Sequence, residues 1–189
     1  DITDLPTHKI AEIGIARTFQ NIRLFGLMTA QENLMVAMHS HLKSKIIATI
    51  LRTPRQRREE REAEEKAQEI LDYVGIGNLT YEYARNLSYG DQRRLEVARA
   101  LALQPKVLLL DEPSMGLAPQ MIANIFRIIT EINKQGVTIL LVEQNAQQAL
   151  QRAHRAYILE TGNVTKEAKA SDLLNDPAVR EAYLGTGAH

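Results

Sequence analysis

Two continuous apolar segments, separated by an amphipathic stretch of helix length, dominate the second half of the chain. Residues 107–110 are Val-Leu-Leu-Leu, and residues 137–142 are Val-Thr-Ile-Leu-Leu-Val. The apolar residues between them that recur at helical spacing are Met121, Ile122, Ile125, Ile128, Ile129 and Ile132. Strands that are buried on both faces and separated by helices belong to parallel α/β sheets. We therefore predict an α/β fold here, with a parallel sheet flanked by helices.

The first half of the chain carries a helical pattern instead of a strand pattern. Between Thr29 and Tyr83, apolar residues recur at the spacing of a helix face. The clearest members of this face are Ala63, Ala67, Ile70, Leu71 and Val74. In the charged run 52–69, interleaved glutamates favour a solvated helix face over a phosphate-binding stripe. We predict an α-helical lobe placed before the α/β part.

Composition excludes several classes of partner and site. The chain has 189 residues, 23 Lys and Arg against 23 Asp and Glu, and no cysteine. Zero net charge gives no overall field that would attract nucleic acid. The lack of cysteine excludes disulfides and cysteine-ligated zinc. Since no apolar stretch approaches the length of a membrane span, we expect neither a nucleic-acid partner nor direct membrane insertion.

Two adjacent carboxylates, Asp111 and Glu112, directly follow the first apolar strand. A dry interior penalises such charges strongly unless a partner neutralises them. In α/β sheets, ligands lie beyond the carboxyl ends of the strands. One interpretation is that Asp111 holds Mg²⁺ on nucleotide phosphates while Glu112 polarises the attacking water. The alternative is that both carboxylates only cap the loop.

A helix start lies just upstream of this strand, within residues 86–105. Ser88 and Asp91 have the spacing of a capping box, and an apolar helix face follows them. The free N–H groups and the dipole at such a helix start form an anion site. Taken alone, the pattern indicates only a well-capped helix, but its place immediately before the strand to Asp111 favours a nucleotide site.

Five short strings resemble, in the same order, the motifs of the ATP-binding subunits of ABC transporters. They are RTFQ at 17–20 (the Q-loop), LSYGDQ at 87–92 (the signature loop), VLLLDEP at 107–113 (Walker B), SMGLAP at 114–119 (the D-loop) and LVEQN at 141–145 (the switch loop). The resemblance covers nearly the whole chain. It implies a P-loop NTPase-like parallel sheet flanked by helices, with an inserted α-helical subdomain.

The resemblance divides the chain into three expected parts. Residues 1–28 would be a remnant of the ATPase core with the Q-loop. Residues 29–100 would be the helical subdomain, ending in the signature loop and its helix. Residues 101–189 would be the α/β core with Walker B, the D-loop and the switch loop.

The resemblance also implies roles for individual residues, with ATP and Mg²⁺ as cofactors. The implied residues are catalytic Glu112 and Gln144, nucleotide-binding Ser88, Gly90 and Gln20, and metal-binding Asp111 and Gln20. Ser88 and Gly90 would serve ATP bound by a second ATPase subunit, in a homodimer or a heterodimer. Transmembrane permease subunits would hold the chain at the inner face of the cell membrane, on the cytoplasmic side.

Within this family, the sequence is most similar to the paired ATPase subunits of branched-chain amino acid importers. RTFQNIRLF and NLSYGDQRRLEVARAL resemble one member of that pair. DEPSMGLAP, QGVTILLVEQN and AYILETGNV resemble the other more closely. The likeness implies that the chain energises the import of branched-chain amino acids, without assigning it to either member.

The sequence departs from the family pattern in several places. No glycine is followed by lysine, and only 19 residues precede Gln20, whereas a strand, phosphate loop and helix take roughly 30. We therefore expect a fragment that lacks the first strands and the phosphate loop. Tyr89 and Asp91 replace the usual signature residues. Gln144 stands where the family usually has histidine, and Ala118 where many relatives have aspartate.

Two other functions stay open on the sequence. The chain could be a non-hydrolytic interaction module that donates its signature loop to a partner ATPase. It could also be a soluble ABC-type ATPase unrelated to transport, such as those of DNA maintenance or translation. Zero net charge and a single ATPase core argue against the latter.

The missing Gly-Lys string predicts the behaviour of the polypeptide 1–189 by itself. Without phosphate-loop amides and lysine, most contacts to ATP are lost, so this polypeptide should bind Mg-ATP weakly and release no phosphate. Calorimetry and a steady-state phosphate assay measure both properties. Steady phosphate release that disappears in Glu112→Gln would contradict this expectation.

Overall fold

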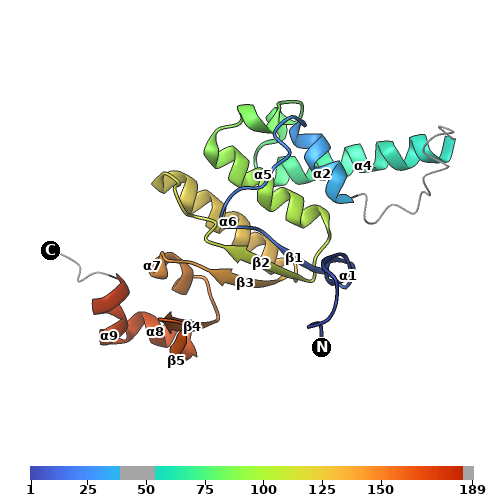
Figure 1. Ribbon diagram of the computed structural model, residues 1–189. Coiled ribbons are helices and arrows are strands. Elements are labelled where there is room, and N and C mark those ends of the chain that lie inside the picture. The colour runs from blue at the N-terminus through green and yellow to red at the C-terminus, as the bar shows by residue number, and fades with distance from the viewer. Residues whose placement is uncertain (39–53, 185–189) are drawn as a thin grey trace. The chain divides into compact units, whose positions relative to one another are not determined.

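The computed structural model describes residues 1–38 and 54–184 and divides the chain into two compact units (Figure 1). The first unit comprises residues 1–140, and the second begins at residue 141. None of the helices in the described ranges is long and apolar enough to cross a membrane.

The first unit combines a small sheet with helices that cover it. Its helices and strands are α1 (Thr7–Glu12), β1 (Ile15–Arg17), α2 (Ala30–Met38), α4 (Pro54–Tyr73), η2 (Gly77–Leu79), η3 (Ala84–Asn86), α5 (Tyr89–Ala102), β2 (Val107–Asp111) and α6 (Pro119–Lys134), and β3 (Thr138–Val142) runs across the boundary to the second unit. Strand, helix and strand alternate from β2 to β3. This alternation confirms the predicted α/β pattern.

The sheet has the order β1-β2-β3, and β1 pairs with β2 in parallel. Ile15 lies opposite Val107, and Arg17 lies opposite Leu109. The apolar side chains of β2 alternate between full and partial burial, and Leu108 and Leu110 are buried completely. Because the register is parallel, the carboxyl ends of β1 and β2 lie at the same edge of the sheet.

Helices α2, α4 and α5 pack against one another on one side of this unit (Figure 1). The predicted apolar face of α4 is inside, with Ala63, Ala67 and Leu71 buried, and Val74, directly after the helix, is buried as well. The α4 residues between these buried positions are mostly exposed, which confirms the predicted solvated face. Residues 39–53, part of the predicted helical subdomain, lie outside the described residues.

The second unit is an antiparallel hairpin with short helices. Its elements are α7 (Ala146–Leu150), β4 (Arg155–Glu160), β5 (Asn163–Lys169), α8 (Ala170–Asn175), α9 (Pro177–Val179) and a π-helical turn η4 (Arg180–Leu184). Pro177 occupies the first turn of α9. The small core of this unit contains Leu150, Ala170, Leu173 and Val179.

One sequence expectation differs from the structure. Residues 137–142 were expected to be buried on both faces, but burial alternates along β3, and Leu140 is 55% exposed. Described residues cover only one face of β3. The apolar side chains on that face are partly buried, and those on the other face are exposed. The division of the chain at residues 28 and 100 stays a prediction.

Candidate functional site

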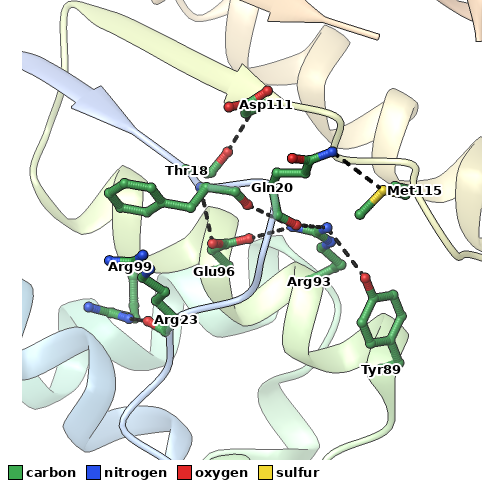
Figure 2. A network of polar contacts seen from close by, with 10 residues as sticks. Thr18, Gln20, Arg23, Tyr89, Arg93, Glu96, Arg99, Asp111 and Met115 are labelled. Carbon is green, nitrogen blue, oxygen red and sulfur yellow. Dashed lines mark hydrogen bonds and ion pairs between the residues drawn. The ribbon is translucent and has the colours of Figure 1, made fainter. Parts of the chain in front are cut away.

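The site is built where the chain leaves β1 and β2 at the same sheet edge. Thr18, the residue after β1, is buried and donates its N–H to the Leu109 carbonyl at 2.9 Å. Its hydroxyl Oγ1 accepts the N–H of Asp111 at 3.3 Å (Figure 2). These two bonds continue the strand pairing beyond the last residue of β1. The Q-loop and the Walker B carboxylates are thereby fixed beside each other.

Gln20 and Glu112, two predicted site residues 92 positions apart, meet directly. The side-chain amide Nε2 of Gln20 donates to Glu112 Oε2 at 3.0 Å. Glu112 has a φ of +46°, a left-handed backbone conformation that glycine adopts more readily than other residues. Such strain persists only where surrounding contacts hold it, and it clusters at functional sites. The Glu112 backbone therefore departs from the extended conformation of β2 directly after Asp111.

Asp111 ends β2 with a carboxylate that is 27% exposed and paired with Arg17. Arg17 Nη2 lies 2.9 Å from Asp111 Oδ2, and the guanidinium also lies over the Phe19 ring. In this structure, Arg17 at the end of β1 thus supplies the opposite charge that the carboxylate at the end of the apolar strand requires. The same carboxylate oxygens are accessible to a ligand.

A buried ion pair on α5 holds the backbone of the Q-loop (Figure 2). Arg93 Nη1 lies 2.9 Å from Glu96 Oε2, and the two side chains are 1% and 7% exposed. Arg93 also donates to the carbonyl oxygens of Phe19, at 3.0 Å, and of Gln20. Glu96 Oε1 accepts the Phe19 N–H at 3.2 Å. The Q-loop peptide on either side of Phe19 is therefore fixed to the signature helix.

Burial raises the pKa of Glu96 above its ordinary value, because removal from water disfavours the charged carboxylate. The Phe19 amide and the Arg93 guanidinium favour the charged form and offset part of this effect. The net direction is upward, since the carboxylate lies in a largely dry position between α5 and the Q-loop.

The signature loop forms the start of α5, as predicted. Ser88 is the N-cap residue, and its Oγ accepts the Asp91 N–H at 3.2 Å and donates to Asp91 Oδ2 at 2.6 Å. This confirms the predicted helix start with Ser88 as its N-cap, although the Asp91 carboxylate accepts the Ser88 hydroxyl and not, as in a full capping box, the Ser88 backbone N–H. Gly90 lies against Met121, where a Cβ on the glycine would come within 2.3 Å of Met121 Cε. The Met121 side chain thus occupies the space beside Gly90 where a Cβ would lie.

Gln144 lies in the second unit, between β3 and α7. Its carbonyl accepts the Ala146 N–H at 2.8 Å, and the next residue, Asn145, caps α7 through the Gln148 N–H at 3.2 Å. The local turn thus presents Gln144 directly before a helix start. Its predicted switch role stays a prediction.

Oxygen atoms of Asp111, Glu112 and Gln20 are hard ligands of the kind that Mg²⁺ prefers. In the part of the chain that the structure describes, no three His, Cys, Asp or Glu side chains form a ready metal cluster. Mg²⁺ usually keeps several waters and is shared between one or two carboxylates and substrate phosphates. The donor set therefore fits a nucleotide-borne Mg²⁺ rather than a protein cage.

Sequence reasoning missed the two residues that hold the Q-loop. Arg93 and Glu96 are an oppositely charged pair at spacing i, i+3, which on most helices indicates a solvated surface. The available signal was their position among the apolar residues Leu95, Val97 and Ala98, all of them buried. Thr18 was also missed, because a single hydroxyl after a three-residue strand carries no pattern.

Comparison with protein families and curated proteins gives consistent matches. A family model described as ABC transporter matches residues 1–115. The chain is 40% identical over 182 residues to the high-affinity branched-chain amino acid transport ATP-binding protein LivG of Salmonella typhimurium, covering 96% of this chain and 71% of LivG. It is 39% identical over 186 residues to the corresponding protein BraF of Pseudomonas aeruginosa, covering 98% and 73%.

Solved structures agree with these sequence matches. The ATP-binding cassette MJ1267 of an ABC transporter superposes with a TM-score of 0.77 at 30% identity, covering 97% of this chain and 73% of that one. The cassette MJ0796, solved as a dimer in a post-hydrolysis state with ADP and Pi, superposes with a TM-score of 0.72 at 25% identity, covering 88% and 68%.

The raised pKa of Glu96 predicts a pH dependence of stability. From the ordinary glutamate value of 4.5 up to the raised value, the folded chain binds more protons than the unfolded chain. The contribution of this carboxyl to the free energy of unfolding is therefore full at lower pH and is lost as the pH rises. Urea unfolding should show wild type losing stability relative to Glu96→Gln with rising pH. Glu64→Gln, on the exposed face of α4, should follow wild type, and the opposite trend for Glu96→Gln would contradict the assignment.

Proposed function

The chain belongs to the ABC transporter family, and from this membership we propose that it is the ATP-binding, ATP-hydrolysing subunit of a branched-chain amino acid importer. The observation that supports this role is the junction of Q-loop and Walker B, with Gln20 bonded to Glu112 at 3.0 Å. Its relatives LivG and BraF are named as ATP-binding proteins of branched-chain amino acid transport.

In this proposal, the carboxyl end of β2 is the hydrolytic centre. Asp111 and Gln20 would hold Mg²⁺, which, when bound, neutralises charge on the nucleotide phosphates. Glu112 would orient the attacking water and accept its proton, because its carboxylate is an acceptor that lies beside Gln20 at the end of β2. The Gln20 amide donates to that carboxylate and holds it in place until the water takes over the contact.

The signature loop would serve a nucleotide held by a second ATPase subunit. Ser88 and Gly90 lie in the first turn of α5, a helix of 14 residues whose N-terminal N–H groups and dipole favour a phosphate. The dimeric ADP-bound and Pi-bound state of MJ0796 shows that a cassette of this fold pairs with a second copy. We propose the same arrangement here, with either a copy of this chain or a related subunit.

An exposed apolar patch follows the Q-loop and fits a permease subunit. We define this docking patch by Phe19, Phe25, Leu27 and Met28, which are between 37% and 74% exposed. Its backbone is held firmly, because the buried Asn33 accepts the Phe25 N–H at 3.0 Å and donates to the Phe25 carbonyl at 3.1 Å. A fixed apolar surface suits an amphipathic helix of a partner, and such a contact would place the chain at the membrane.

The two strand-end carboxylates should respond differently to substitution. In a fusion that places an ABC phosphate-loop segment ahead of Asp1, Asp111→Asn should weaken Mg²⁺-dependent nucleotide binding, because a neutral amide is a poorer Mg²⁺ ligand. Glu112→Gln should preserve binding and slow hydrolysis by about 10²–10⁴-fold. Nucleotide affinity and turnover are measured for each variant. Hydrolysis by Glu112→Gln at the wild-type rate would show that Glu112 is only a loop carboxylate.

The docking patch yields a separate test of assembly. Leu27 is 74% exposed, so Leu27→Glu should leave the unfolding midpoint unchanged while abolishing co-purification with the permease subunits. Lys66→Glu, on the exposed face of α4, introduces a larger change of charge and should leave co-purification intact. If Leu27→Glu unfolds the chain, or if both variants still co-purify, the docking assignment is wrong.

A further inference from the structure

The guanidinium of Arg93 contacts two loops that carry separate roles in the proposed function, on which this inference rests. It holds the Q-loop through the carbonyls of Phe19 and Gln20. Its Nη2 also lies 3.3 Å from the hydroxyl of Tyr89, the signature-loop residue that directly follows the N-cap Ser88. Arg93 lies over the Tyr89 ring as well, 5.7 Å from the ring centroid (Figure 2). One side chain therefore contacts both loops at once.

The Tyr89 ring extends this connection to the D-loop. Gly116 has a φ of +75°, and a Cβ placed on it would lie 3.2 Å from Tyr89 Cε1. The ring is thus in close contact with the backbone of the D-loop. A glycine at position 89, which the ABC signature usually carries, has neither a hydroxyl for Arg93 nor a ring for Gly116. The connection is therefore a property of this chain's own tyrosine.

Burial makes the position of Arg93 sensitive to each of its partners. The side chain is 1% exposed, and a buried cation is tolerated only when opposite charge and hydrogen bonds surround it. Its Nε has no hydrogen-bond partner among the described residues. The two terminal nitrogens consequently carry all of its described bonds, shared between Glu96, the Q-loop carbonyls and Tyr89.

We propose that Arg93 is a positioning residue that couples the signature loop to the Q-loop within one subunit, with the Tyr89 hydroxyl as the link. A displacement of the Q-loop carbonyls shifts the guanidinium, and the guanidinium then shifts Tyr89. Coupling of this kind is reciprocal, so a change at the signature loop is also felt at the Q-loop. The signature loop, which would face the nucleotide of the partner subunit, thereby responds to the Q-loop, which lies beside Asp111 and Glu112 of this subunit.

Amide hydrogen exchange of the polypeptide 1–189, followed by NMR, tests this coupling without nucleotide or partner. Two amides report on the two loops: the Phe19 N–H, which donates to Glu96, and the Asp91 N–H, which donates to Ser88. Tyr89→Phe removes the hydroxyl and keeps the ring. It should leave the unfolding midpoint unchanged and accelerate exchange of the Phe19 amide by about three- to tenfold, the range for loss of one hydrogen bond.

Tyr83→Phe is the matched control, because Tyr83 is 46% exposed against 45% for Tyr89 and also lies beside an arginine. It should leave exchange at Phe19 unchanged. Arg93→Lys keeps the positive charge but loses the planar fork of donors, and it should accelerate exchange at both Phe19 and Asp91.

Three results would overturn the coupling. The first is that, in Tyr89→Phe, the Phe19 amide exchanges at the wild-type rate while the stability is unchanged. The second is that Tyr89→Phe lowers the unfolding midpoint and accelerates exchange uniformly, including at the core amide of Ile128. The hydroxyl would then be a general stabilising group. The third is an unaffected Asp91 amide in Arg93→Lys. Because the measurement requires no ATPase activity, its failure is distinguishable from failure of the proposed function.

Discussion

The buried ion pair between Arg93 and Glu96 is the contact on which the site depends. Desolvation of two charges is costly, and it is offset only when further hydrogen bonds satisfy both groups. Here those bonds go to the backbone of residues 19 and 20. The electrostatic requirement of the pair therefore fixes the Q-loop on α5. A loop that would otherwise cross the surface freely acquires a defined position relative to the signature helix.

The parallel register of β1 and β2 provides the second half of this geometry. Thr18 continues the pairing by one residue, through Leu109 and Asp111. Gln20 is then close enough to bond Glu112. The Q-loop is thus held from two sides, by the sheet before Phe19 and by α5 at and after it. The Gln20 side chain points to the carboxylates because the sheet and α5 together hold the Q-loop backbone in place.

Apolar side chains remain on the surface after the Q-loop, on a segment whose backbone is also held from within. Asn33 is fully buried and uses its amide to hold residues 25–29 from within. Phe25, whose N–H and carbonyl both bond to Asn33, and its neighbour Leu27 have exposed side chains. In the proposed function, this surface would receive a permease subunit. Site and docking patch are therefore successive segments of one continuously supported loop.

The sequence by itself determined the features that depend on neighbours a few positions apart. The periodicity of α4 and α6, the N-cap at Ser88 and the strand that ends at Asp111 are all local, and each is present in the structure. The five motif strings indicated the family for the same reason, because each is a short stretch of neighbouring residues. Only the tertiary structure decided the burial of Arg93 and Glu96, the meeting of Gln20 with Glu112, and the exposed face of β3. An Arg–Glu pair at helical spacing looks the same in sequence whether water or a distant loop lies over it, and that loop lies more than 70 positions away.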